Sequence, residues 1–562
     1  MHQTTTTKTQ TGRLLRVTVA GFASLFVGHA QGAAPGITGP SFDLVASPAY
    51  ISQPDGQSVY SWGYGCNTTP SGFAPATIGA QQGANCPTMQ IPGPTLIVHE
   101  GDTVTVTLTN DLPKAAGNTS ILFPGFQVTA APAASQPNTC TAAPTSQGLL
   151  TTEATPGCAV TYTFTASSPG TRAYYSGTQG DLQVEMGLYG AIIVLPNVVP
   201  AETLPTGVPP GCHRMNAGLT LPDGQPDFRL AASAYDIPQS CYDREYLFQF
   251  SEMDPRIHRQ AEEQAGAACN QPSGCMTVET EPYHPAYFMV NGRSMPDDMD
   301  PNYASQYPHQ PYNGNPHVHP GELALLRIIG TGRWQHPFHE HANHVHILAR
   351  DGNLLLSATD PTKLAGPLLF TTTSTPGLAM DGIFYWTGKG LNWDVYAHTS
   401  SGAGAVYNID TAADPAHATY NGQQVVCNPD ANGYYTVASG APPDAPNYYE
   451  WCQDHLLPLE AHPFGEVGSG GPATLPDSNI LTNGLWYGGS PYLGPDATGR
   501  AIGPTSTTPP SGTIGNPREE SGFAFMWHSH NEREITTNNI FPGGMMMMLL
   551  VDPQAFVINE SN

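Results

Sequence analysis

Two groups of histidines are the residues whose types and spacing could do chemistry in this chain. They lie in the segments HPFHEHANHVHILARDG, with His336, His339, His341, His344 and His346, and WHSHNEREITTNNIFPGGMMMM, with His528 and His530. Residues two apart in a strand project from the same face, so each His-x-His pair can offer two imidazoles to one metal ion or to a metal pair. Neutral imidazole suits copper, zinc, nickel and iron, and the spacing does not choose among them.

The alternative is that these histidines only fill a polar interior or a solvent face. Two His-x-His pairs, with His336 three residues before His339, favour metal binding over that alternative. A further pair, His317 and His319, is equally consistent with adventitious binding at a surface turn. The run Met545–Met548 could offer thioethers to Cu(I), but on a strand we expect it to pack in the core.

The elements that must position these histidines are predicted to be strands. Residues Gly93–Asn110 alternate apolar residues and threonine on either side of Glu100–Gly101–Asp102, which predicts a β-hairpin. Ala159–Ala166 alternates in the same way, and Gly187–Leu195 is typical of a buried closing strand. A second β unit begins near Tyr246, and three further strands are expected in it, at 286–294, 321–329 and 344–352. Only Ala261–Gln264 looks helical.

The chain of 562 residues is too long for one core, so we expect several domains. With 60 glycines and 55 prolines, many short strands and turns are favoured over long helices. The interval 42–197 reads as one sandwich, followed by a Pro/Gly-rich connector. We expect further domains at 240–415 and 416–556, the last with long loops.

The charge balance excludes two classes of partner. Only 11% of the residues are charged, yet the formal net charge is −26. Such a surface repels nucleic acid and anionic lipid, so neither is expected as a partner, whereas cations fit it better. An acidic surface that only keeps an exported protein in solution explains the charge equally well.

The N-terminus and the cysteines predict export. Lys8, Arg13 and Arg16 precede a short apolar run, Val17–Val27, and small residues follow it, so residues 1–32 are interpreted as a cleaved signal peptide. No membrane span is expected. The ten cysteines fit an oxidising compartment, and consecutive pairing would close local loops of 6 to 29 residues. The expected location is periplasmic, extracellular or at the cell surface.

Several of these segments resemble a known family. PGPTLIVHEGDTVTVTLTN and GTRAYYSGTQGDLQVEMGLYGAIIVLP look like the opening and the close of the first cupredoxin domain of multicopper oxidases. HPFHEHANH and WHSH resemble the copper-binding motifs of that family, and the motifs together look most like its large bacterial manganese-oxidising branch. The resemblance implies an all-β chain of two to three cupredoxin-like Greek-key β-sandwich domains. It implies that His336 is a mononuclear blue-copper ligand and that His339, His341, His528 and His530 are trinuclear-cluster ligands.

Departures from the family pattern are as informative as the matches. Ser529 replaces the cysteine of the blue-copper site, and a hydroxyl cannot supply its soft thiolate. The second blue-copper histidine falls on Glu534. In the first domain Leu122–Phe123–Pro124 and Tyr175–Ser176–Gly177 stand where the family has His-x-His pairs, so half of the trinuclear ligands are missing. The sites are therefore degenerate, and one or two copper ions are expected rather than the full four-copper set.

The expected function is that of a secreted, copper-binding multicopper-oxidase-like protein. If it is an enzyme, it oxidises a metal ion such as Mn(II), or a phenol, with dioxygen, and without a conventional blue-copper site. The alternative is a non-catalytic copper-binding or structural cell-surface protein on the same scaffold. A homo-oligomer or a partner subunit is left open. The wide separation of His341 and His528 leaves two arrangements: a last domain with a long insertion, or, as we favour, a first cluster in a middle domain that packs against the last one.

Overall fold

The chain folds into β-sheets with few helices, which confirms the all-β prediction. The computed structural model describes residues 34–76, 84–141, 143–198, 227–271, 274–318, 322–386, 522–551 and 558. It also describes short strands between residues 407 and 492: β23 (Tyr407–Asn408), β24 (Thr419–Tyr420), β25 (Gln423–Gln424), β26 (Asn428–Pro429), β27 (Tyr435–Thr436) and β28 (Gly489–Tyr492). The signal peptide expected at 1–32, His319 and most of 416–521 lie outside the described residues.

The first sandwich consists of two five-stranded sheets that enclose one core. Sheet 1 has the order β11 (Gly170–Tyr175), β12 (Tyr189–Leu195), β5 (Leu96–His99), β1 (Gly36–Thr38), β4 (Phe73–Ala74). Sheet 2 has the order β3 (Ser58–Cys66), β2 (Ser41–Ser52), β6 (Thr103–Asn110), β10 (Ala159–Thr165), β7 (Thr129–Pro132). Alternation places Val104, Val106 and Leu108 of β6 in the core and the intervening threonines outward. The expected strands at 159–166 and 187–195 are present.

The predicted hairpin at 93–110 is wrong. Strand β5 pairs in parallel with β12 and β1, whereas β6 pairs with β2 and β10 in the other sheet. The turn at Glu100–Gly101–Asp102 therefore carries the chain from one sheet to the other, and Gly101 has the positive φ that this corner requires. Alternation of apolar and polar residues indicates only which face of a strand is buried. It cannot distinguish two strands paired in a hairpin from two strands that lie in opposite sheets.

The second sandwich holds both histidine segments. Sheet 3 has the order β14 (Tyr287–Val290), β13 (Arg244–Met253), β16 (Leu323–Gly330), β22 (Ala379–Tyr385), β18 (Val345–Arg350), β19 (Asn353–Leu354), with β20 (Leu368–Leu369) on β18. Sheet 4 has the order β15 (His317–Val318), β30 (Met546–Val551), β29 (Gly522–Ser529), β17 (His336–Glu340), β21 (Thr371–Ser374), with β28 on β29. Met545 and Met547 pack in its core, as expected for that run.

Strands from the two ends of this half of the chain pair directly. β29 and β30, which the sequence assigned to a third domain, lie in one sheet with β17. The two histidine motifs therefore meet as neighbouring strands of one sandwich, and contact between two separate domains is not what brings them together. This pairing of β17 with β29 supports the alternative in which one domain carries a long insertion, here between β22 and β29. The predicted domain bounds, 240–415 and 416–556, stay a prediction.

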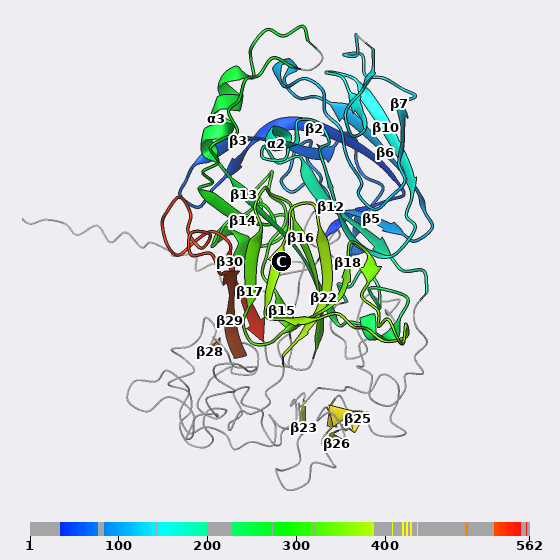
Figure 1. Ribbon diagram of the computed structural model, residues 1–562. Coiled ribbons are helices and arrows are strands. Elements are labelled where there is room, and N and C mark those ends of the chain that lie inside the picture. The colour runs from blue at the N-terminus through cyan, green and yellow to red at the C-terminus, as the bar shows by residue number, and fades with distance from the viewer. Residues whose placement is uncertain are drawn as a thin grey trace, which may run out of the picture.

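The outer face of sheet 1 packs against sheet 3 and joins the two sandwiches. Ile97, Ala191 and Ile193 lie in one apolar cluster with Leu247 and Ile329. In Figure 1 the blue-to-cyan sandwich lies above the green one, with the C-terminal red strands beside the green sheet. The contact between the two sandwiches therefore has an apolar centre, and polar groups cross it at the points described below.

The helices are short and lie in the connections. They are η1 (Lys114–Ala116), α2 (Gly180–Gln183), η2 (Pro238–Ser240), α3 (Pro255–Gln264) and η3 (Asp297–Met299), with a small hairpin of β8 (Thr145–Gln147) and β9 (Thr152–Ala154) beside them. Helix α3 begins where the Asp254 carboxylate accepts the amide of Arg256 at 2.9 Å, with Pro255 in the first turn. It extends the expected helical stretch 261–264 by two turns toward the N-terminus. None of the helices in the described part of the chain has the length and hydrophobicity of a membrane-spanning segment.

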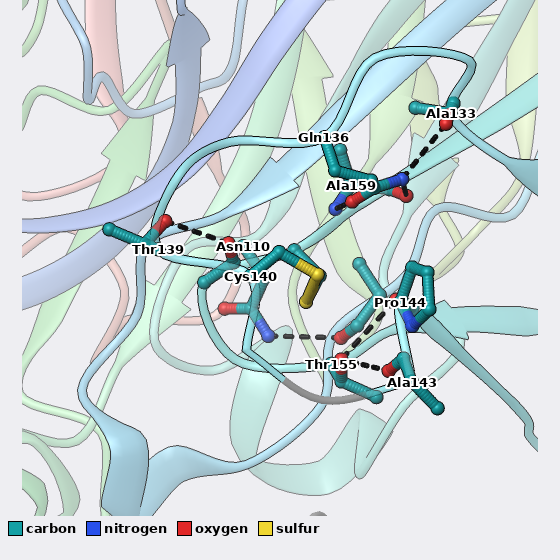
Figure 2. Close-up of a disulfide and its surroundings, with 12 residues drawn as sticks. Asn110, Ala133, Gln136, Thr139, Cys140, Ala143, Pro144, Thr155 and Ala159 are labelled. Carbon is teal, nitrogen blue, oxygen red and sulfur yellow. Dashed lines mark hydrogen bonds between the residues drawn. A yellow bond between two sulfur atoms is a disulfide. The ribbon is translucent and has the colours of Figure 1, made fainter.

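Three of the expected disulfides are present. They join Cys66 to Cys86, Cys140 to Cys158 and Cys269 to Cys275. Cys241 is also disulfide-bonded, and its expected partner Cys212 lies outside the described residues, as do Cys427 and Cys452. Figure 2 shows the Cys140 bridge beside Thr155, whose hydroxyl donates to the carbonyl of Ala143 at 2.7 Å.

Removing the Cys140–Cys158 bridge is expected to destabilise the first sandwich. The bridge spans 18 residues, so replacing both cysteines by serine frees the unfolded chain and costs about 3 kcal/mol. The matched control, Cys269→Ser with Cys275→Ser, opens a loop of 6 residues and is expected to cost about 2 kcal/mol. Denaturant unfolding of the two double variants measures both values, and a larger loss for the shorter loop would contradict the loop-entropy argument.

Candidate metal centre

Four histidines converge on one face of sheet 4. β17 and β29 are antiparallel neighbours, and His339 lies directly opposite His528 in the register. Side chains directly opposite one another in such a pair share a face, and so do residues two apart along each strand. The predicted pairs His339–His341 and His528–His530 are therefore brought together from segments far apart in the sequence.

The ring positions confirm this convergence. The centroid of His339 lies 4.7 Å from that of His341, 4.8 Å from that of His530 and 5.8 Å from that of His528. His528 lies 5.1 Å from His341 and 5.3 Å from His530. Each of the four imidazoles lies beside at least two of the others, so they form a single cluster, called the histidine cluster below.

The closest contact in the histidine cluster has the spacing of a chelating pair. Nε2 of His341 lies 3.2 Å from Nε2 of His528. Two nitrogens that bind one ion through bonds of 2.0–2.1 Å at the tetrahedral angle are about 3.3 Å apart. Nδ1 of His528 donates to the carbonyl of Ser529 at 2.8 Å, so the lone pair of its neutral ring is on Nε2, the nitrogen that faces His341.

The electrostatics keep these rings able to bind a cation. Burial, and then the proximity of His530, lowers the pKa of His339 to about 4. Burial also lowers the pKa of His528. Since the neutral imidazole is the metal ligand, both rings are in the binding form at neutral pH. The hydroxyl of Thr371, 2.9 Å from Nδ1 of His339, fixes the orientation of that ring.

The cluster reaches the surface on one side. His339 and His341 are buried, His530 is exposed, and the ring of Phe370 covers the cluster edge, 5.5 Å from His339. Phe370 is 55% exposed and also lies 5.3 Å from the ring of His344. A small solute can therefore approach the cluster past His530 and Phe370 without opening the core.

In the present side-chain positions, the site offers one pair of ligand nitrogens rather than a complete set of metal ligands. Within the described residues, no group of three or more His, Cys, Asp or Glu side chains is arranged to hold a metal ion. The His341–His528 pair is the preformed part, and rotation of the His339 or His530 ring would have to bring in a third nitrogen. The donor set, imidazole throughout, is chemically suited to copper.

His336 does not join the cluster. It is three residues before His339 on β17, so it projects from the opposite face of the strand. Its Nδ1 lies 2.9 Å from Glu534 and its Nε2 lies 2.8 Å from Glu252, and its side chain is fully buried. These two carboxyl groups raise the pKa of His336 to about 9 against the opposing effect of burial. With both nitrogens engaged, the ring has no lone pair directed at a cation.

The remaining histidines of the motifs lie elsewhere. His317 is buried on β15 and His346 belongs to β18 in sheet 3. In the first sandwich Leu122 and Tyr175 form a β-bridge, so the segments 122–124 and 175–177 lie side by side. They bring Phe123 into the apolar core and carry no imidazole.

Sequence reasoning missed two of the groups that shape this region. Glu252 sits in β13, REYLFQFSEM, in which every residue is buried. A glutamate inside such a strand is a signal that could have been noticed, because a buried carboxyl group requires a partner. Thr371, in contrast, is an ordinary strand residue, and only the register of β21 with β17 shows that it reaches His339.

Comparison with known proteins supports the family on part of the chain. Residues 79–198 match the family model described as multicopper oxidase. The matched segment covers β5 to β12 of the first sandwich. No curated protein matches the chain in sequence.

Several solved structures of copper proteins are similar to this chain at low identity. A multicopper oxidase, mgLAC, is 13% identical with a TM-score of 0.41, over 92% of this chain and 88% of that chain. A blue copper oxidase from Nitrosomonas europaea is 14% identical with a TM-score of 0.39, over 91% and 85%. A copper nitrite reductase from Nitrosomonas europaea is 18% identical with a TM-score of 0.34, over 62% and 84%. These weak similarities carry no functional argument, and the similarity to multicopper oxidases rests on residues 79–198.

Proposed function

We propose that the protein is an exported, multicopper-oxidase-like protein that binds one or two copper ions through the histidine cluster. The proposed ligands are His339, His341, His528 and His530. The observation that carries the proposal is the 3.2 Å contact between Nε2 of His341 and Nε2 of His528, made by rings from two distant segments. His336 is left out of the set because both of its nitrogens face carboxyl groups.

The proposed reaction is the oxidation of a metal ion such as Mn(II), or of a phenol, by dioxygen. Copper bound at the cluster would supply the one-electron chemistry. The residues of the chain orient the rings through Thr371 and the Ser529 carbonyl, and sheet 4 closes one side of the cluster to water. The exposed side, at His530 and Phe370, is where a small reductant would approach.

Export is part of the same proposal. It is supported by the three disulfides within the described residues and by the charge-poor, acidic composition. The manganese-oxidising branch is proposed on its motif resemblance alone.

Reconstitution with Cu(II) tests this function. The purified protein, freed of metal and then dialysed against Cu(II), is expected to retain one or two ions and to give an EPR signal of copper bound by nitrogen. Oxygen uptake on addition of Mn(II) or a phenol is then measured, with the Cu-free protein as control. Retained copper without oxygen uptake would leave a non-catalytic copper-binding protein, and absence of retained copper would reject the proposal.

A further inference from the structure

A separate polar cluster lies where the resemblance would have a mononuclear copper ion. Nδ1 of His336 lies 2.9 Å from Oε2 of Glu534, the hydroxyl of Ser529 donates to the same oxygen at 2.5 Å, and Nε2 of His336 lies 2.8 Å from Oε2 of Glu252. The four side chains are 0–3% exposed. Every polar group that faces this position is therefore already engaged by another residue of the chain.

This cluster holds the segment that follows β29. Glu534 accepts from the side-chain amide of Asn531 at 2.9 Å, and the amide of Asn531 donates to the hydroxyl of Ser529 at 3.1 Å. The amide of Met545 donates to the carbonyl of Glu534 at 2.7 Å. The segment 529–534 is thus fixed at both ends. It contains His530, and its first residue, Ser529, lies between His528 and His530 in the sequence.

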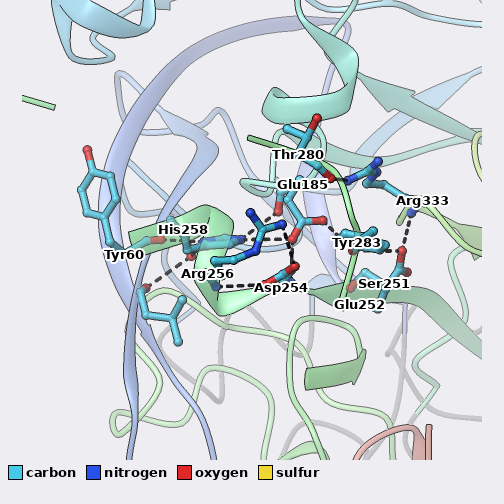
Figure 3. A network of polar contacts seen from close by, with 12 residues as sticks. Tyr60, Glu185, Ser251, Glu252, Asp254, Arg256, His258, Thr280, Tyr283 and Arg333 are labelled. Carbon is cyan, nitrogen blue, oxygen red and sulfur yellow. Dashed lines mark hydrogen bonds and ion pairs between the residues drawn. The ribbon is translucent and has the colours of Figure 1, made fainter. Parts of the chain in front are cut away.

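Glu252 attaches the same cluster to the rest of the fold. Its Oε1 accepts the amides of Arg333 at 2.6 Å and Trp334 at 2.8 Å, in the turn that leads into β17. The hydroxyl of Tyr283 lies 3.2 Å from this oxygen and 2.6 Å from Glu185 of the first sandwich. Figure 3 shows Tyr283 between Glu185 and Glu252, with Arg333 beside it. One connected set of hydrogen bonds thus runs from the interface between the sandwiches to the residue between the two C-terminal histidines.

We propose that Glu252, His336, Glu534 and Ser529 form a metal-free lock that positions His528 and His530 against His339 and His341. These four are positioning residues, since none of them is a proposed ligand and Ser529 touches a ligand ring only through its carbonyl, which accepts from Nδ1 of His528. A backbone hydrogen bond from His530 to the carbonyl of Pro337 at 2.8 Å and the ring contact of His530 with His339 also connect β17 to the segment after β29. The lock adds the side-chain contacts that hold the two histidine pairs in one register. Its effect on metal binding rests on the function proposed above.

The variant Glu534→Gln tests the lock without removing a ligand. The amide keeps the volume of the side chain but places an NH2 group either against both Ser529 and His336 or against the side-chain amide of Asn531. Outer contacts of this kind alter metal affinity by roughly 10- to 100-fold. We expect Cu(II), as the probe metal, to bind the histidine cluster in Glu534→Gln with affinity lower by that factor and with a changed EPR hyperfine pattern. Glu252→Gln is expected to act in the same direction.

Asp381→Asn is the matched control. Asp381 is a buried carboxyl group that also joins the two sandwiches, accepting from the amide of Thr171 at 3.0 Å, from its hydroxyl at 2.6 Å, and from Tyr235 at 2.5 Å. It contacts none of the four lock residues. This variant should leave the Cu(II) affinity and the EPR pattern as in the wild-type protein, although it also loses a buried charge.

A measurement on the metal-free protein separates the lock from the proposed function. Diethyl pyrocarbonate modifies accessible imidazoles, and mass spectrometry reports the rate at each histidine. We expect His339 and His528 to react several-fold faster in Glu534→Gln than in wild-type protein or Asp381→Asn, because local opening exposes them. If wild-type protein binds no Cu(II), the proposed function fails. The modification rates of His339 and His528 then test the lock by themselves. Unchanged rates and unchanged Cu(II) binding in Glu534→Gln, or equal changes in Asp381→Asn, would overturn it.

Discussion

Replacing His528 with alanine is expected to weaken Cu(II) binding by more than about 100-fold, beyond the usual effect of losing an outer contact. His528 supplies one of the two nitrogens that already lie at chelating distance, 3.2 Å apart. Without it, His341 is a single imidazole in a largely buried position. The ring of His528 is also the neighbour of both His341 and His530, so its loss leaves His339 as the ring that lies beside both of them. Titration with Cu(II), followed by EPR, measures the affinity and the nitrogen ligation together.

His346→Ala is the control for this substitution. His346 is partly buried on β18 of sheet 3, which is not the sheet of the cluster, and burial lowers its pKa as it does that of His528. The control removes an imidazole of similar character that lies outside the cluster. Equal Cu(II) affinities in His528→Ala and wild-type protein would show that the His341–His528 contact is not a chelating pair. An equal loss of Cu(II) affinity in His528→Ala and His346→Ala would mean that copper binds outside the histidine cluster.

The chemistry of the cluster could be predicted from the sequence because it depends on a local rule. Two histidines separated by one residue in a strand must share a face, and this holds for His339 with His341 whatever the rest of the chain does. The same rule indicates that His336, three residues earlier, faces the other way. The family resemblance also gives His336 a site apart from His339 and His341 but makes it a copper ligand, whereas the structure places carboxyl groups at both of its ring nitrogens.

Strand partners could not be predicted because they depend on long-range register. The alternation in β5 and β6 is the same whether the two strands form a hairpin or lie in opposite sheets. The 187 residues between His341 and His528 likewise favoured separate domains, since a sandwich rarely contains so long an excursion. Only the pairing of His339 with His528 across β17 and β29 shows that one sandwich contains both. Nothing in the local sequence of either strand specifies that partner.

Replacing His336 with alanine is expected to lower the free energy of unfolding by about 3–5 kcal/mol, the cost of leaving buried charges without their partner. The substitution leaves Glu252 and Glu534 buried in the absence of the ring that lies between them. Urea unfolding near pH 6 measures this loss. His258→Ala is the control, because His258 is equally buried but burial lowers its pKa to about 4, so its ring is neutral.

The dependence of this loss on pH distinguishes a charged ring from a merely well-packed one. The pKa of His336 in the folded protein, about 9, is above that of an unfolded histidine, about 6.5. A raised pKa stabilises the fold fully below the unfolded value, and the stabilisation is lost as the pH rises through the folded value. The difference between wild-type protein and His336→Ala should therefore shrink by about 3 kcal/mol between pH 6.5 and pH 10. The depressed pKa of His258 changes stability only below about pH 6.5, so the difference for His258→Ala stays constant over the same range. A constant difference for His336→Ala as well would mean that the ring is neutral and that hydrogen bonding alone holds the two carboxyl groups.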